Sequence, residues 1–278
     1  MDVKVFRTFL EVANTRHFGR AADNLYITQA AVSARIKQLE EYVGAILFER
    51  VRNNINLTPA GERMLPYATT MVRVIEQIKN DIPLVDSKLT QFSVAATPNI
   101  WDAFFQSHLN SIAKTFPELV FKTEMLNNRQ LQASILDNTL DLALMFDPFL
   151  ANEVNSEALA SIELILVSSQ PDQTATQAME SNYVYVDWGV QFATEHNSKH
   201  GRTNNPKLTT STIRIALDFI LSEGGAAYLP CSLIEPYLQS KELFKVSGAH
   251  MMQRTIFAVY QNDSVNKELI QSVLAEIK

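Results

Sequence analysis

Residues 18–52 read FGRAADNLYITQAAVSARIKQLEEYVGAILFERVR, and their apolar spacing predicts two short, consecutive helices. The apolar side chains of the second helix recur at steps of four, three and four residues, at Val32, Ile36, Leu39 and Val43. This spacing places them on one side of the helix. The opposite side carries Gln29, Ser33 and Lys37, which can form hydrogen bonds. A compact helix pair with one polar, outward helix is typical of a helix-turn-helix, whose second helix enters the DNA major groove.

A wider set of residues in and around this stretch carries a family resemblance. They are Phe18, Ala21, Ala22, Leu25, Gln29, Ala31, Val32, Ser33, Ile36, Leu39, Glu40, Gly44, Leu47, Phe48, Arg50, Leu57, Thr58 and Gly61. Together they resemble the N-terminal signature of LysR-type transcriptional regulators. The segments RHFGRAADNLY (16–26) and FERVRNNINLTPAGERMLPYA (48–68) are similar to the HdfR-like subgroup of that family.

The resemblance implies a multidomain protein that combines α+β and α/β parts. A winged helix-turn-helix DNA-binding domain would span residues 1–58 and a dimerising linker helix residues 59–88. Residues 89–278 would form a two-lobed effector-binding domain, similar in fold to periplasmic solute-binding proteins. Its first lobe would cover about 91–161 and 248–278, and its second about 162–247. By analogy with the family, the subunits would form dimers and tetramers on double-stranded promoter DNA.

The composition is that of an ordinary globular protein of 278 residues, 46% hydrophobic and 19% charged. No apolar run approaches the ~18 residues of a membrane span, and no basic and apolar leader begins the chain. The single cysteine, Cys231, has no internal partner for a disulfide, which fits a reducing compartment. We therefore expect a cytoplasmic protein.

The net charge of −6 is distributed unevenly along the chain. Residues 1–58 carry eight basic and six acidic side chains, a balance of +2, so the remaining 220 residues carry −8. Only the N-terminal part is therefore suited to phosphate. Because its excess of positive charge is small, we expect DNA affinity to need more than one copy of the domain.

Residues around the start of the second helix are the candidates for reading bases. Gln29 and Ser33 are short donors or acceptors near its N-terminus, and Gln can bond adenine at two positions. Surface solvation, or capping of the helix by Gln29, is the alternative. With the wing between Leu47-Phe48 and Ile55–Leu57, the predicted DNA-binding set is Thr28, Gln29, Ala30, Ser33, Arg35, Lys37, Arg50, Arg52 and Asn53. Lys37 and the wing residues are expected to contact the DNA backbone or minor groove.

Thr58-Pro59 predicts the start of a long helix, with Thr as the cap and Pro in the first turn. Its apolar residues form a narrow, heptad-like seam that we assign to dimerisation, at Met64, Ala68, Met71, Ile75 and Ile78. A helix that instead packs on the core of its own subunit is the alternative. Pro83 closes the element, and Asp86 to Gln91 is read as a polar hinge.

From Phe92 onward, strands alternate with helices, which predicts a parallel α/β sheet. In such folds, ligands bind at the carboxyl ends of strands and the N-termini of helices. The residues at these places are the candidates for effector binding: Thr97, Pro98, Asn99, Phe146, Asp147, Trp188, Thr210 and Ser211. Helix capping or hinge filling is the alternative for all of them. None is an arginine, so a strongly anionic effector is not favoured.

The remaining motifs are weak. His196 and His200 lie four residues apart, but the surrounding Asn- and Ser-rich segment reads as a loop and no third ligand is evident, so no metal is expected. Cys231 precedes a helix but has no second cysteine for a redox switch. No nucleophile elbow, phosphate loop or dinucleotide motif occurs, so we expect neither a cofactor nor enzyme activity. The competing function is a solute-binding or sensor protein whose N-terminal helices serve only assembly. A second competitor is a small-molecule enzyme of two α/β lobes.

Overall fold

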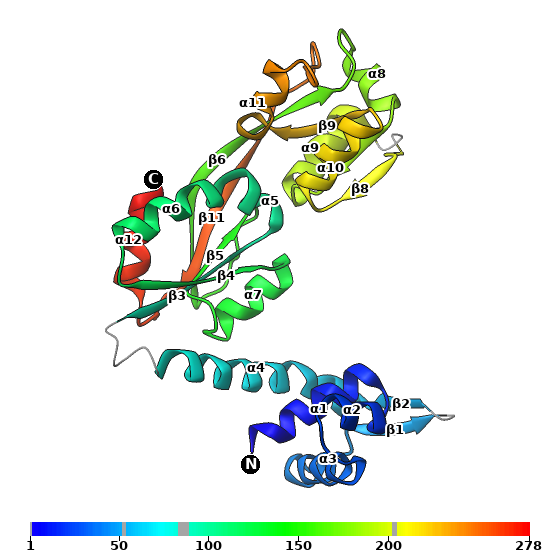
Figure 1. The fold of residues 1–278 in the computed structure, drawn as a ribbon, viewed down its shortest axis with the longest axis vertical. Coiled ribbons are helices and arrows are strands. Elements are labelled where there is room, and N and C mark those ends of the chain that lie inside the picture. The colour runs from blue at the N-terminus through cyan, green and yellow to red at the C-terminus, as the bar shows by residue number, and fades with distance from the viewer. Residues whose placement is uncertain (1, 52–53, 83–88, 202–204) are drawn as a thin grey trace. The chain divides into compact units, whose positions relative to one another are not determined.

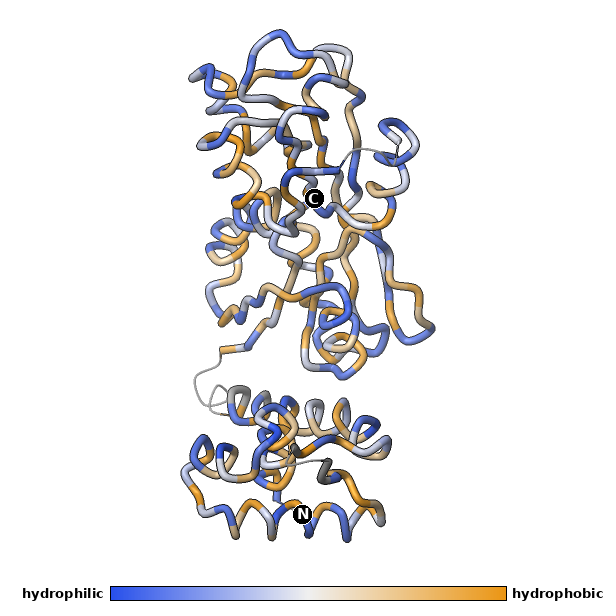
Figure 2. Tube along the Cα trace, turned by 90° about the vertical axis from the view of Figure 1, so that its right-hand side faces the viewer, coloured by the Kyte–Doolittle hydropathy of each residue, from blue (hydrophilic) through white to orange (hydrophobic). Residues whose placement is uncertain are grey.

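The computed structural model describes residues 2–51, 54–82, 89–201 and 205–278. The chain divides into two compact units, Met1–Lys88 and Leu89–Lys278. Within the described residues no helix is long and apolar enough to cross a membrane. Figure 2 shows hydrophilic and hydrophobic residues mixed along the chain.

The smaller unit contains four helices and a two-stranded hairpin among its described residues (Figure 1). The elements are α1 (Val3–Thr15), α2 (Phe18–Asn24), α3 (Gln29–Val43), β1 (Phe48–Val51), β2 (Asn54–Leu57) and α4 (Pro59–Asp81). Strands β1 and β2 pair antiparallel, with Phe48 opposite Leu57. The predicted helix pair and wing are therefore present.

Local signals in the sequence explain where these helices begin and end. The side chain of Thr28 accepts a hydrogen bond from the Ala31 amide at the start of α3, and Gly44 ends this helix with φ 69°. At the start of α2, the side chain of His17 provides the N-cap: its Nδ1 accepts from the Gly19 and Arg20 amides. Each of these contacts satisfies backbone groups that a helix terminus leaves without partners.

One hydrophobic core holds the smaller unit together. Its fully buried members come from α1, α2, α3, α4 and the segment before β1: Phe9, Val12, Ala21, Val32, Leu39, Leu47 and Ala68 are all at most 1% exposed. A Cβ at Gly61 would lie 2.2 Å from the backbone oxygen of Leu47, so α4 can pack here only through a glycine. The Glu40 carboxylate accepts from the Leu47 amide at 2.8 Å, which anchors the segment that leads into the wing.

Helix α4 shares its apolar side chains between this core and solvent. Ala68 is fully buried and Met64 packs against the same core, whereas Met71 is 50% and Ile78 47% exposed. Glu76 of α4 also pairs with Arg7 of α1 at 3.0 Å. The predicted seam is therefore divided: its first part belongs to the core of the same unit, and only the later part is accessible.

The larger unit is built on one nine-stranded sheet in its described residues. The strand order is β4 (Leu119–Met125), β3 (Thr90–Ala96), β5 (Leu142–Met145), β11 (Met252–Gln261), β6 (Val154–Ser168), β9 (Ala226–Pro230), β7 (Tyr183–Val186) and β8 (Leu208–Thr210), with β10 (Phe244–Lys245) paired to β6. The long strands β6 and β11 run through both halves of the unit (Figure 1). They connect a first lobe, around β3–β5, to a second lobe, around β7–β9.

The sheet is mixed, whereas the alternation of strands and helices predicted a parallel one. Strands β3, β4 and β5 are parallel to each other, as are β7, β8 and β9. The crossing strands pair antiparallel with their neighbours: β11 with β5 and β6, and β6 with β9. Parallel pairing therefore holds within each lobe, and the two long strands that join the lobes break it.

Helices cover both lobes. In the first lobe, α5 (Pro98–Ile100), a π-helical segment (Trp101–Phe105) and α6 (Gln106–Thr115) follow one another without a break, and α7 (Asn128–Leu136) and α12 (Lys267–Ile277) complete it. The second lobe carries α8 (Ala175–Glu180), α9 (Val190–His200), α10 (Ile213–Ser222) and α11 (Cys231–Gln239). The loop predicted around His196 and His200 is wrong, because both residues lie in helix α9.

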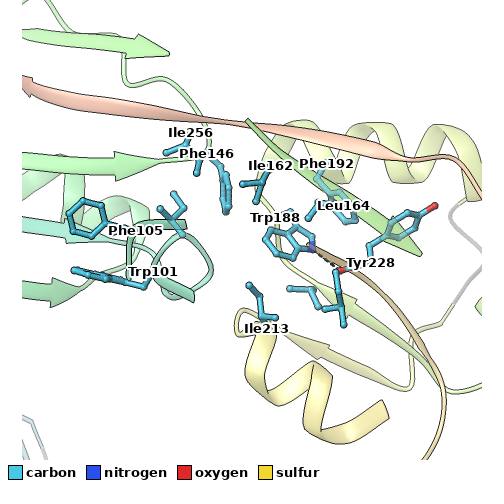
Figure 3. Close-up of a cluster of buried hydrophobic side chains, with 14 of the residues drawn as sticks. Trp101, Phe105, Phe146, Ile162, Leu164, Trp188, Phe192, Ile213, Tyr228 and Ile256 are labelled. Carbon is cyan, nitrogen blue, oxygen red and sulfur yellow. Dashed lines mark hydrogen bonds between the residues drawn. The ribbon is translucent and has the colours of Figure 1, made fainter. Parts of the chain in front are cut away.

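A single aromatic-rich core continues from one lobe into the other (Figure 3). Phe146, which follows β5, meets Trp188, which follows β7, edge to face with ring centroids 5.7 Å apart. The Trp188 indole is fully buried and its Nε1 donates to the Tyr228 carbonyl of β9 at 3.2 Å. The joint between the lobes is therefore packed like a protein interior.

Candidate nucleic-acid interface and ligand cavity

The outward face of α3 presents exposed side chains that can form hydrogen bonds. Gln29, Ser33 and Lys37 are exposed at successive steps of four residues, while Val32 and Ile36 are buried on the other side. Thr28 and Ala30 are exposed as well, and Thr28 caps the helix. This arrangement leaves the first turns of α3 free to approach base edges.

Two of the predicted basic contacts on α3 have different surroundings. Arg35 is half-buried and its Nη1 donates to Thr8 Oγ1 of α1 at 3.2 Å, so it lies against the neighbouring helix. Lys37 forms only an exposed i,i+4 pair with Glu41 at 3.6 Å. Because exposed pairs of this kind contribute little, phosphate can replace Glu41 as its partner.

The wing follows the hairpin predicted from the sequence. The backbone of Arg50 lies in β1 opposite Ile55, while Arg52 and Asn53 lie outside the described residues. Tyr26, two residues before the cap of α3, is 95% exposed and has φ 53°. An exposed tyrosine in the left-handed region at this turn was absent from the predicted set.

A cavity of about 240 Å³ lies at the carboxyl ends of the strands in the larger unit. Its lining residues are Thr97, Pro98, Asn99, Met125, Leu126, Asn127, Asn128, Phe146, Asp187, Gly189 and Ser211. Five of the eight predicted effector residues are among them: Thr97, Pro98, Asn99, Phe146 and Ser211. The structure adds six residues that were not predicted, at the end of β4 and after β7: Met125, Leu126, Asn127, Asn128, Asp187 and Gly189.

The three other predicted residues lie outside the lining and support it. Trp188 is part of the core. Asp147 accepts from the Val190 amide at the start of α9, and Thr210 Oγ1 accepts from the Thr212 amide before α10. They therefore cap helices or fill the joint.

Asn99 connects the two lobes directly at the cavity wall. This buried side chain donates through Nδ2 to the Asp187 carbonyl and accepts through Oδ1 from the Ile213 amide, both at 2.9 Å. A second link joins Arg214 of α10 to Asp102 at 2.8 Å. Both contacts bring residues of the first lobe against the second.

Arg254 of β11 is a further connection that the sequence reasoning missed. The residue is 1% exposed, and its guanidinium donates to four acceptors: the Trp188 carbonyl, Gln191 Oε1, the Phe146 carbonyl and Asp147 Oδ1, at 2.6–3.0 Å. Two of these acceptors belong to each lobe. A buried cation that is fully surrounded by acceptors can be tolerated in an interior.

The pair His196 and His200 belongs to a different, aromatic cluster. His196 Nε2 lies 2.8 Å from the Tyr183 hydroxyl and His200 Nε2 lies 3.0 Å from that of Tyr228. Burial, followed by the neighbouring His200, lowers the pKa of His196 to about 4. Burial also raises the pKa of Tyr228 to about 12. Within the described residues, no group of three His, Cys, Asp or Glu side chains could hold a metal ion.

Comparison with known proteins assigns both units. Residues 3–62 match the bacterial regulatory helix-turn-helix protein, lysR family, and residues 87–278 match the LysR substrate binding domain. The chain belongs to the LysR family. A relative from Yersinia enterocolitica, the HTH-type transcriptional regulator HdfR, is 34% identical over 99% of this chain and 95% of its own length. The HdfR of Yersinia pestis has the same identity and coverage.

Solved structures agree with this LysR-family assignment at the level of the fold. CbnR, a LysR family transcriptional regulator, aligns with a TM-score of 0.76 at 14% identity over 100% of both chains. Full-length CbnR complexed with its target DNA aligns with a TM-score of 0.73 at 16% identity, covering 100% of this chain and 99% of that one. The predicted family and its HdfR-like subgroup are both confirmed. The alternative of a solute receptor with N-terminal assembly helices is set aside, because the relatives are transcriptional regulators.

Proposed function

We propose that this LysR-family regulator reads promoter DNA with α3, through Gln29 and Ser33, with Thr28 and Ala30 close to the groove. Lys37 and the wing residues Arg50, Arg52 and Asn53 would contact phosphates or the minor groove. The observation that carries the proposal is the exposed polar face of α3 opposite its buried apolar face. Arg35 is assigned to packing against α1 because it already donates to Thr8.

The same proposal gives the other parts of the chain their roles. Residues 1–58 would bind DNA, 59–88 would link and dimerise, and 89–278 would bind an effector in the cavity between the lobes. Dimerisation would use the accessible part of α4, at Met71, Ile75 and Ile78, and pairs of dimers would form a tetramer. The protein would act in the cytoplasm, without enzyme activity.

A duplex-binding experiment tests the base-reading role. Fluorescence anisotropy would compare the protein's own upstream intergenic DNA with a scrambled duplex across salt concentrations. Gln29→Ala and Ser33→Ala should each weaken specific binding by about 1–3 kcal/mol and leave the scrambled duplex nearly unaffected. Lys37→Ala should weaken both duplexes and reduce the salt slope by about one unit.

Gln38→Ala is the matched control for Gln29→Ala. Gln38 is also an exposed glutamine on α3, but it lies about 140° around the helix from Ser33. Its substitution should leave the preference for specific DNA unchanged. If Gln29→Ala changes the preference for specific over scrambled DNA no more than Gln38→Ala does, α3 does not read bases with the face that carries Gln29.

A further inference from the structure

The charge of the ligand cavity is set by one side chain. Asp187 is the only ionisable residue among the described residues that line it. Asp187 is exposed, and its Oδ1 accepts from the Gly189 amide at 2.9 Å. Its other oxygen accepts from none of the described residues, so it is available to a ligand.

Amides at the starts of α9 and α10, where a carboxylate ligand could bind, already have acceptors within the protein. Free amides at helix N-termini attract anions. At α9, the Gly189 amide donates to Asp187 and the Val190 amide to Asp147 Oδ2 at 3.2 Å. At α10, the Ile213 amide donates to Asn99 at 2.9 Å. At the starts of these two helices, two carboxylates and one amide oxygen of the chain thus take positions that an anionic ligand could use.

The nearby buried cation is equally committed. Arg254 donates to four acceptors, one of which is Asp147 at 2.9 Å, so the charge of this pair is balanced within the protein. Arg214 pairs with Asp102, and neither residue is in the lining. The uncompensated charge at the cavity is therefore that of Asp187.

The rest of the lining suits a molecule with an apolar body. Met125, Leu126 and Phe146 supply hydrophobic surface. The Thr97 hydroxyl oxygen is buried and has no hydrogen-bond partner among the described residues. A buried hydroxyl without a partner is unfavourable, and a ligand N–H that donates to it would remove that cost. The volume of about 240 Å³ has room for a ring of roughly benzene size and a substituent.

We propose that this cavity binds a small cationic ligand, an amidine, guanidine or amine on an apolar body. The cation would lie at Asp187 and its N–H groups within reach of Thr97, while the body packs on Met125, Leu126 and Phe146. This inference rests on the proposed effector role of the cavity and names the class of molecule that would fill that role.

Three probes of nearly equal shape and different charge test the proposal: benzamidine, benzamide and benzoate. Isothermal titration with the full-length protein should show benzamidine binding in the millimolar range, as expected for about nine non-hydrogen atoms. It should bind about five- to tenfold more tightly than benzamide, with benzoate weakest. Tighter binding of benzoate than of benzamidine would overturn the proposal, as would the failure of all three to bind.

Variants locate the effect in the cavity. Asp187→Asn keeps an oxygen that can accept from the Gly189 amide. In this variant the affinity for benzamidine should fall to that for benzamide. Asp218→Asn is the control, because Asp218 is exposed on α10 and lies outside the lining. Thr97→Val should weaken benzamidine binding without lowering the melting temperature, since the Thr97 hydroxyl has no hydrogen-bond partner among the residues that the structure describes. An unchanged charge preference in Asp187→Asn would overturn the assignment.

The DNA-binding assay on the same samples separates the two proposals. If specific DNA binding is present while benzoate is the preferred probe, only the cationic class of ligand is wrong. If specific DNA binding is absent, the proposed function fails whatever the order of the probes.

Discussion

Replacing Arg254 with methionine removes the most connected side chain at the joint between the two lobes. Methionine fills a similar volume but donates no hydrogen bond. The substitution would remove the guanidinium donor from the Phe146 and Trp188 carbonyls, from Gln191 Oε1 and from Asp147 Oδ1. Because Arg254 is 1% exposed, little room is left for water to replace the guanidinium.

The size of the effect can be worked out from these contacts. A buried acceptor left without a partner costs about 1–3 kcal/mol, which applies to the two carbonyls. The Asp147 side chain is 28% exposed, so water can hydrate part of its carboxylate. We therefore expect Arg254→Met to lower the free energy of unfolding by about 3–5 kcal/mol, as for the loss of one partner of a buried ion pair. The free energy of unfolding of Arg254→Lys should lie between those of the unchanged protein and Arg254→Met, because one ammonium cannot reach four acceptors on two lobes.

Urea denaturation followed by tryptophan fluorescence provides the assay. The chain has two tryptophans, Trp101 and Trp188, and both lie in the larger unit. Their emission therefore reports the unfolding of that unit and not of the DNA-binding unit. Arg129→Met is the matched control, since Arg129 is exposed on α7, and it should change stability by no more than about 0.5 kcal/mol. A loss below about 1 kcal/mol in Arg254→Met would refute the reasoning.

Two further predictions concern α4 and the histidine cluster. Met71→Glu should weaken self-association in sedimentation velocity and leave the melting temperature unchanged. Thr69→Glu, at a polar exposed position of α4, should alter neither quantity. Equal self-association of the two variants would contradict a dimerising role for the exposed face of α4 at Met71. Because the pKa of His196 is lowered to about 4, protonation favours the unfolded state, so stability should be full above about pH 6.5 and fall by roughly 1 kcal/mol towards pH 5. Urea denaturation at both pH values checks this, and His196→Gln should flatten the dependence; an unchanged slope would exclude His196 as its source.

The smaller unit could be predicted closely because its signals are local. Apolar residues at helical spacing, Thr28 before α3 and Gly44 after it all act within one or two turns. The position of Ala68 was harder to predict, because a heptad-like seam looks the same whether it faces a second subunit or the core of its own. Packing against α1 decides this, and it is a property of the tertiary structure.

In the larger unit, elements defined by distant partners were predicted least well. Helix α9 carries Asn, Ser and two His residues of modest helix propensity, and it is held in place by Phe192 and His196 packing on Tyr183 and Tyr228. Strand β6 begins at Val154, eight residues before the predicted start of the second lobe at about residue 162, because residues 154–161 pair with β11. Pairing over such a sequence distance overrides weak local strand propensity.

The cavity shows the same division between local rules and distant contacts. Residues after β3 and β5 were found because strand ends predict ligand sites, and the same rule applied to β4 would also have found Asn127. After β7 the rule selected Trp188, whereas its neighbours Asp187 and Gly189 line the cavity. Arg254 could not have been found in this way, because it lies within a strand and its acceptors are 63–108 residues away in the chain.

The backbone at Gly189 explains why the joint between the lobes is this close. Gly189 has φ 89°, and a Cβ there would lie 2.5 Å from Asp147 Oδ2 and 3.1 Å from Arg254 Nη2. Only a glycine lets the start of α9 approach so closely to Asp147, which follows β5, and to Arg254 of β11. The Gly189 amide in turn holds Asp187, which lines the cavity. A ligand that moves Asp187 would therefore act on the contacts that keep the two lobes together, and this linkage is a physical route from the cavity to the lobe arrangement.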